Sequence, residues 1–231
     1  MGPRREKITG MPHSPRLEFL AHIERTLYTA VISDSLDDLG FRDRALRENV
    51  RPAYPCRPFA GWAFTFACID VYRVTPEPYA KEIEAVDSLL PGHVAVAGTG
   101  RSTRNAPWGE LLSTAAQARG ARGAVIDGFV RDVKKIEEID FPVFAAGVKP
   151  LDSKGRGIVN EYQVPVDCGG VVVHPGDLIV ADFDGVIVVP ASIVEETIAL
   201  ATDKATRETH TRDELRGGAF LRDVYARYGV L

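Results

Sequence analysis

Short apolar runs alternate with amphipathic segments through the middle of this chain, and this alternation constrains the fold more than any other feature. The apolar runs are HVAVAG (93–98), AVID (124–127) and PVFAAG (142–147). They have the length of buried strands, and glycine or proline stands at their ends. The segments that separate and precede them have helical spacing: residues 78–90, 108–119 and 131–139. Strands that alternate with helices predict an α/β domain.

The flanking segments add more helices and a different kind of strand. Residues 17–40 are expected to form two helices, the second of them capped by Ser33. Residues 60–72 alternate small and apolar residues as a strand does. The run VVVHPGDLIVADFDGVIVVP (171–190) predicts two or three strands joined by hairpin turns, and residues 191–216 predict a long charged helix. Hairpins added to strand–helix units predict a mixed sheet.

Composition narrows the classes of protein to consider. The 231 residues, 45% of them hydrophobic, suffice for one core, so a single domain is expected. A net charge of −4 argues against nucleic-acid binding, which normally requires a basic face. No apolar run approaches the ~20 residues that span a bilayer, so no membrane partner is expected. The cysteines number three, and their wide spacing fits neither a metal site nor a disulfide framework, which predicts a reducing, cytoplasmic location.

The composition of the first and last segments predicts the domain boundaries. Residues 1–16 are rich in glycine and proline and are expected to form a flexible tail, followed by the α/β domain over residues 17–203. Residues 204–231 carry too little apolar surface for an independent domain and too much for a free tail. We therefore expect this extension to pack on a neighbouring subunit.

The sequence GAVIDGFVRD (123–132) is the first candidate site. A buried strand delivers Arg131 and Asp132 to its carboxyl end, where open α/β sheets place their ligands. The planar guanidinium of Arg131 suits a carboxylate or an enolate oxygen, and Asp132 is a hard oxygen ligand suited to Mg²⁺ or Mn²⁺. The alternative is structural, with a surface salt bridge and a helix N-cap made by Asp132.

The loop that precedes the 108–119 helix is the second candidate. Free N–H groups in the first turn of a helix bind anions, and Leu111 and Leu112 would supply them here. Gly109 would let a ligand approach the backbone closely. The alternative is that the glycines of this loop only close a tight turn.

Together these pieces resemble a known family, the regulators of ribonuclease activity A and the 4-hydroxy-4-methyl-2-oxoglutarate aldolases. The resemblance is carried by PWGELL, GAVIDGFVRD, FPVFAAGVKP and HPGDLIVADFDGVIVVP, in the family's order and spacing between about Asp70 and Pro190. It implies a swivelling-domain-like (phosphohistidine-domain-like) α/β/α fold with a mixed sheet. It also implies a homotrimer or a dimer of trimers, a site between subunits, a bound Mg²⁺ or Mn²⁺, and pyruvate as a product.

The family's aldolases share an acidic residue, twenty intervening residues and then Arg-Asp. Here Glu110 stands at the acidic position, before Arg131 and Asp132, although the family pattern has Asp there. The resemblance implies that Glu110 and Asp132 hold the metal, joined by a C-terminal acid of a neighbouring subunit, for which we select Glu208. Arg131 and the N–H groups near Leu111 would then stabilise the enolate of a cleaved 4-hydroxy-2-oxo acid, and the same site would decarboxylate oxaloacetate.

Rival functions remain open at this point. The first is a non-catalytic protein that binds and regulates a ribonuclease, as other family members do; some of these lack the Asp of the Arg-Asp pair, which this chain keeps. The second is a methyltransferase, for which the chain offers no convincing nucleotide-binding loop with an acidic ribose partner. The sequence therefore favours a metal-dependent carbon–carbon lyase.

Overall fold

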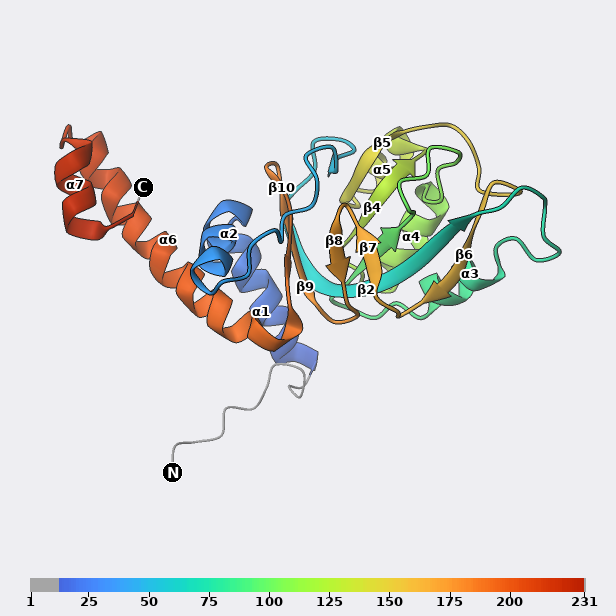
Figure 1. Cartoon of the computed structure of the whole chain (residues 1–231), viewed down its shortest axis with the longest axis horizontal. Helices are drawn as coiled ribbons and strands as arrows, with labels where there is room; N and C mark the ends of the chain where they lie inside the picture. The colour runs from blue at the N-terminus through green and yellow to red at the C-terminus, as the bar shows by residue number, and fades with distance from the viewer. Residues whose placement is uncertain (1–12, 231) are drawn as a thin grey trace, which may run out of the picture.

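An eight-stranded mixed sheet forms the centre of the computed structural model, which describes residues 13–230 (Figure 1). Its strands are β1 (Arg51–Pro52), β2 (Phe59–Asp70), β3 (His93–Gly98), β4 (Gly123–Val130), β5 (Val143–Val148), β6 (Gly157–Tyr162), β9 (Leu178–Asp182) and β10 (Gly185–Val189). A separate two-stranded sheet consists of β7 (Val166–Cys168) and β8 (Val171–Val173). The expected α/β fold with a mixed sheet is confirmed.

The strand order places four carboxyl ends at one edge. The order is β1-β5-β4-β3-β2-β9-β10, and β6 pairs with β2 outside this path. Strands β2, β3, β4 and β5 run parallel to one another, whereas β1, β6, β9 and β10 pair antiparallel to their neighbours. Carboxyl ends of parallel strands are where such sheets bind ligands, so this edge is the first place to look for a site.

The helices cover the sheet in two groups. Their bounds are α1 (His13–Thr26), α2 (Thr29–Asp38), α3 (Ala80–Asp87), α4 (Glu110–Ala118), α5 (Val133–Glu138), α6 (Val194–Arg216) and α7 (Leu221–Tyr228), with a 3₁₀ turn at Ala191–Ile193. Residues of α3, α4 and α5 share one buried cluster with β2 to β5. Residues of α1, α2 and α6 share another with β2, β9 and β10.

Strand β3 shows why the central runs are apolar throughout. Ala95 and Ala97 belong to the cluster beneath α3, α4 and α5. Val94 and Val96 face the opposite side and pack with residues of β7 and β8. Because both faces of the strand are covered, no alternation of polar residues is expected, in agreement with its sequence.

The start of α2 corrects one prediction. The helix begins at Thr29, so Ser33 lies inside it and the prediction of a Ser33 cap is wrong. The backbone N–H and the hydroxyl of Thr29 both donate to the carboxylate of Asp182, each at 2.7 Å. The first turn is therefore satisfied by a residue at the end of β9, far away in the sequence, which no local capping pattern reveals.

Helices α6 and α7 project from the end of the molecule that lies opposite to β5 and β6 (Figure 1). The predicted boundary at 203/204 falls within α6, whose first half packs on α2. Phe220, Leu221 and Tyr225 on and beside α7 are exposed. The predicted N-terminal tail lies outside the described residues except for 13–16, which belong to α1.

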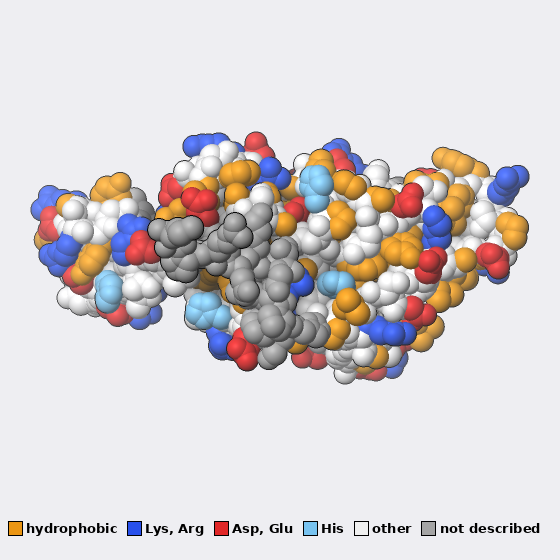
Figure 2. Space-filling model, turned by 90° about the horizontal axis from the view of Figure 1, so that it is seen from below, with side chains coloured by type: hydrophobic (Ala, Val, Ile, Leu, Met, Phe, Trp, Pro, Cys, Tyr) orange, Lys and Arg blue, Asp and Glu red, His pale blue; other side chains and the backbone are white. Residues whose placement is uncertain are grey.

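The surface gives no sign of segregated charge on the face that Figure 2 displays, where acidic and basic side chains are interspersed. Hydrophobic side chains are also visible there among the charged ones, over the part that contains the sheet. Among residues 13–230, no helix has the length and apolar character needed to cross a membrane.

Candidate functional site

Arg131 and Asp132 lie directly after β4, at the edge where the parallel strands end. The Arg131 N–H donates to the Trp108 carbonyl at 3.0 Å, which ties this point to the loop before α4. Asp132 has φ = 60°, in the left-handed region that Asp tolerates better than most residues. Non-glycine residues in this region are often part of a functional site.

Gly109 brings the two sequence candidates together. A Cβ at this position would lie 2.7 Å from Asp132 Oδ2 and 3.1 Å from Arg131 Cγ, so only glycine leaves room for both side chains. The Glu110 N–H lies 3.5 Å from Asp132 Oδ2. The first turn of α4, which includes Leu111 and Leu112, therefore opens beside the Arg-Asp pair, and its N–H groups have no partners within the helix.

The structural alternative for Arg131 and Asp132 holds only in part. Arg131 Nε lies 3.7 Å from Asp132 Oδ2, with the two side chains 38% and 47% exposed. A pair that is this open to water contributes little to stability. Asp132 occupies the N-cap position of α5 but makes no side-chain cap hydrogen bond there, so the alternative of a cap on this helix is wrong. Its carboxylate lies instead against the Glu110 N–H in the first turn of α4.

Glu110 and Asp132 have the chemistry of an open magnesium site. Residues 13–230 contain no group of three or more His, Cys, Asp or Glu side chains arranged to hold a metal. Mg²⁺, however, usually takes one or two carboxylates and completes its shell with water and substrate oxygens. The exposed Asp132 carboxylate fits this mode. The Glu110 carboxylate accepts a hydrogen bond from the Thr114 hydroxyl at 2.7 Å and lies in the adjacent first turn.

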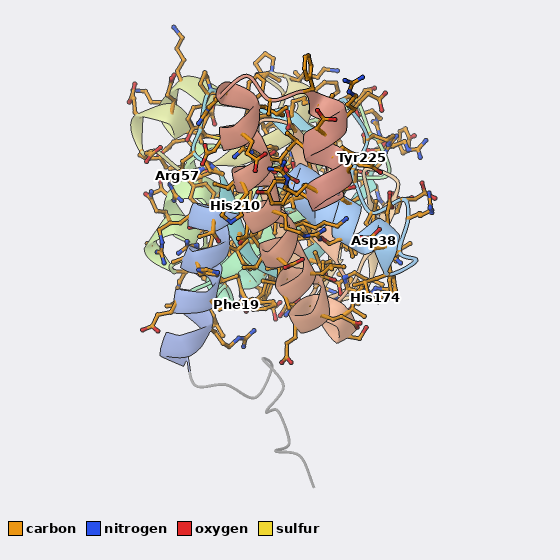
Figure 3. The ribbon with its side chains drawn as sticks, turned by 90° about the vertical axis from the view of Figure 1, so that its left-hand side faces the viewer. Phe19, Asp38, Arg57, His174, His210 and Tyr225 are labelled. Atoms are coloured by element: carbon orange, nitrogen blue, oxygen red, sulfur yellow. The ribbon has the colours of Figure 1, made fainter. Side chains whose placement is uncertain are left out.

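Glu208 lies on α6, at the other end of the molecule from Arg131. Its carboxylate accepts a hydrogen bond from the Tyr28 hydroxyl, and burial raises its pKa above the ordinary value. It lines a pocket with Asp38 and Tyr225, which Figure 3 labels on the same side of the view. Within one chain Glu208 is therefore not joined to the other candidates.

Asp152 and Tyr79 belong to the same cluster and were not foreseen. Arg131 Nη2 lies 3.2 Å from Asp152 Oδ1, and the Tyr79 hydroxyl donates to Asp152 Oδ2. Burial alone would raise the pKa of Asp152, but the Tyr79 hydroxyl, the Lys154 N–H and Arg131 together hold it below the ordinary value. The hydrogen bond to Asp152 raises the pKa of Tyr79 to about 12. The guanidinium of Arg131 thus lies between two carboxylates, with Asp152 near Nη2 and Asp132 near Nε.

Glu82 is the second unforeseen carboxylate. It lies in the first turn of α3, half-buried, and lines two adjoining pockets. Burial comes first among the causes that raise its pKa to about 7; the Asp152 carboxylate raises it further and Arg131 lowers it. A carboxyl group whose pKa is raised toward neutral pH by burial and nearby charges is a common feature of functional sites.

Replacing Glu82 by Gln is expected to change how stability depends on pH. The folded-state pKa, about 7, lies above the ordinary 4.5, so Glu82 stabilises the fold fully below pH 4.5 and loses this contribution as the pH rises through 7. Glu82→Gln should match the wild type at pH 4 and exceed its unfolding free energy at pH 8 by roughly 1–3 kcal/mol. Urea unfolding at both pH values measures this difference, and an equal effect at the two would contradict it.

Comparisons with known proteins show the family of this chain. The family model described as RraA-like, Aldolase/RraA, matches residues 29–188. This chain belongs to the RraA-like family. The match covers β2 to β5, both candidate loops and most of β10, so it includes every site residue named above except Glu208.

The chain is similar both to a protein provisionally named as an aldolase and to a member of an RNase inhibitor family. A Halalkalibacterium halodurans protein, provisionally named 4-hydroxy-4-methyl-2-oxoglutarate aldolase, is 33% identical over 87% of this chain and 89% of its own length. An uncharacterized Methanocaldococcus jannaschii protein is 42% identical over 56% of this chain, and the match spans only 61% of that relative. The crystal structure of Streptomyces coelicolor RraAS2, described as an unusual member of the RNase ES inhibitor RraA family, has a TM-score of 0.75 and 29% identity over 85% of this chain and 98% of its own.

The resemblance noted in the sequence is confirmed at the level of the RraA-like family, and the structure adds residues to its motif. Asp152 follows β5 in the run LDSKGR, directly after the quoted FPVFAAGVKP segment. Since β5 is parallel to β4, the rule that selected Arg131 also applied to polar residues after β5. Tyr79 occupies the N-cap position of helix α3 and Glu82 lies on this helix, which only the folded chain places beside this edge.

Proposed function

We propose that this RraA-like protein is a divalent-metal-dependent lyase that cleaves a 4-hydroxy-2-oxo acid, such as 4-hydroxy-4-methyl-2-oxoglutarate, and releases pyruvate. One observation carries the proposal: Gly109 lets the Arg131 guanidinium and the Asp132 carboxylate meet at the open first turn of α4. Positive charge, free N–H groups and an exposed carboxylate then share one small site. These are the groups that an enolate-forming reaction requires.

Each residue has a distinct role in this proposal. The Arg131 guanidinium and the N–H groups of Leu111 and Leu112 bind the oxygens on which negative charge grows as the C3–C4 bond breaks. Asp152 holds the guanidinium in place through its ion pair with Arg131. Asp132 and Glu110 hold the divalent cation, with Glu208 from a neighbouring subunit. The bound cation supplies Lewis-acid chemistry to the 2-oxo acid group.

A screen of 2-oxo acids tests the proposal. Purified protein with Mg²⁺ is incubated with branched 4-hydroxy dicarboxylates, with 2-oxo-3-deoxy sugar acids and with oxaloacetate, and pyruvate is measured by a coupled assay. We expect release from at least one 4-hydroxy-2-oxo acid and slower release from oxaloacetate by decarboxylation. No release from any of them would reject the lyase and favour the binding protein discussed below.

The exposed apolar residues at the same edge support a site between subunits. Large side chains that are 44–83% exposed lie on β2, β5, α4 and the loop after β2, namely Ile69, Tyr72, Val74, Leu111 and Val148. Exposed apolar side chains that form one patch usually mark an interaction surface. We propose that another copy covers them in a trimer or a dimer of trimers, with the 204–231 extension also packed on a neighbour. Light scattering at micromolar concentration should give a multiple of three chains, and a monomer mass would contradict this prediction.

The swivelling-domain-like class of the fold and a cytoplasmic location belong to the same proposal. Cys56, Cys68 and Cys168 are all free thiols, which supports a reducing compartment.

A ribonuclease-binding regulator is the second candidate, because the Streptomyces neighbour is described as a member of an RNase inhibitor family. It would use the exposed apolar surface instead of the polar site. Inhibition of an RNase E-type enzyme by wild-type protein, unchanged in Arg131→Lys, together with no pyruvate release, would favour it.

A further inference from the structure

Glu82 lines two pockets, and none of the proposed roles uses its carboxyl group. Cys68, Glu82, Pro107 and Val159 line both pockets, which therefore adjoin each other between α3, β2 and the loop before α4. One of them also reaches Ser153, the neighbour of the Asp152 that pairs with Arg131. The space within these pockets therefore lies next to the candidate site and has a carboxyl group in its wall.

Its size and charge decide what it can take. The space has room for about one water molecule, too little for a substrate side chain. Its charged lining consists of Asp70 and Glu82, with no Lys, Arg or His among the described residues that form it. A second substrate carboxylate would be repelled here. A water molecule, which needs two or more polar partners, fits both the size and the chemistry.

The charged groups that affect the charge state of Glu82 are Asp152, in the loop after β5, and Arg131, directly after β4. Cys68 and Asp70 of strand β2 line a pocket together with Glu82, and Tyr79 occupies the N-cap position of its helix. Burial and the nearby Asp152 favour the protonated acid, whereas Arg131 favours the carboxylate, so the two forms are close in free energy near neutral pH.

We propose that Glu82 is the proton carrier of this site and acts through a water molecule in the adjoining pocket. This inference rests on the proposed lyase function. The Glu82 carboxylate takes the proton of the substrate's 4-hydroxyl through the water, the C3–C4 bond breaks, and its electron pair forms the pyruvate enolate. The carbonyl fragment leaves, and the Glu82 carboxyl returns the same proton to C3, which yields pyruvate. No oxidant, reductant or net proton is required.

Exchange of the pyruvate methyl protons with D₂O isolates this role, because it needs no knowledge of the substrate. The full-length protein with Mg²⁺ and pyruvate is followed by proton NMR from pH 5 to 9. We expect exchange in the wild type to rise with pH to a plateau, with a midpoint near the pKa of about 7. Glu82→Gln should lower the plateau about 10²-fold or more and remove that midpoint. Infrared difference spectra should show a carboxyl band titrating near the same pH, absent from Glu82→Gln.

Glu84→Gln is the matched control. Glu84 lies on the same helix, is exposed and accepts a hydrogen bond from the Tyr162 hydroxyl at 2.8 Å, so this variant should exchange as the wild type does. Wild-type exchange and midpoint in Glu82→Gln would overturn the role of Glu82 and leave the lyase proposal standing. No wild-type exchange together with no pyruvate release would overturn both. Should Glu82→Gln fail to fold, Glu82→Asp decides, since an unshifted midpoint in that variant would reject the inference.

Discussion

Removal of divalent cations is expected to abolish pyruvate release by this protein, and Mg²⁺ or Mn²⁺ is expected to restore it. The candidate site offers carboxylate oxygens from Asp132 and Glu110, without a cluster of His or Cys ligands among residues 13–230. Oxygen-rich, water-filled sites of this kind hold Mg²⁺ only moderately tightly, so EDTA should extract the cation within a dialysis. Pyruvate release before dialysis, after it, and after adding back each cation gives the measurement.

The control for this experiment tests whether the fold and the assembly survive removal of the cation. Circular dichroism and light scattering should be unchanged by chelation, because Asp132 and Glu110 lie on the rim of the sheet and none of the proposed ligands belongs to the three buried clusters. Full activity in protein shown by elemental analysis to be free of metal would rule out the proposed chemistry. Loss of activity together with unfolding would instead assign the cation a structural role.

Arg131→Lys is expected to lower the turnover number about 10²- to 10³-fold, the usual effect of losing a donor that stabilises developing negative charge. Lysine keeps the positive charge but lacks the planar fork that lets Arg131 reach Asp152 at 3.2 Å while it faces the site. Excess Mn²⁺ should restore nothing, because the lost contact is made by the protein. Steady-state kinetics with the best 2-oxo acid of the screen measures this effect.

Asp132→Asn separates the role of the carboxylate from that of the guanidinium. The amide is a poorer ligand for a hard cation, so Mn²⁺ binding measured by electron paramagnetic resonance should weaken, and excess Mn²⁺ should recover part of the activity.

Arg119→Lys is the matched control for Arg131→Lys, since Arg119 makes an exposed ion pair with Asp87 at 2.9 Å. That variant should behave as the wild type does.

A purely structural role of Arg131 and Asp132 predicts a different result. If Arg131 and Asp132 only hold the chain together, both variants should lose stability, by about 1 kcal/mol as for a lost helix cap, and keep their turnover. Asp132 makes no side-chain cap on α5, so any such structural role would act through the Glu110 N–H at the start of α4. Stable variants with wild-type pyruvate release would refute the catalytic roles and leave the ribonuclease-binding protein as the better reading.

The sequence by itself determined the strands and helices at the centre of the fold. Apolar runs such as HVAVAG and AVID could be recognised because strands covered on both faces need apolar residues at every position, and the helical segments between them predicted an α/β domain. Arg131, Asp132 and Gly109 could be identified from the sequence for the same reason. Each of them lies close in sequence to the end of a strand or the start of a helix, and local order was enough to place them at one edge.

Strand β6 and helix α7 were not predicted, and β6 has no strong pattern of its own. GIVNEY pairs antiparallel with the end of β2, and this partner, not its sequence, makes it a strand. The cap of α2 behaves in the same way, since Asp182 and Thr29 are far apart along the chain. Contacts of this kind depend on the register of the sheet, which local propensities do not encode.

Only the tertiary structure decided the second half of the site. Asp152 reaches Arg131 from the loop after β5. Tyr79 and Glu82 come near Asp152 only because α3 packs beside that edge. The pKa of Glu82, about 7, has the same origin, because burial and the Asp152 carboxylate raise it and both exist only in the folded chain. Sequence order selects residues for their chemistry, whereas their distances and their charge states follow from packing.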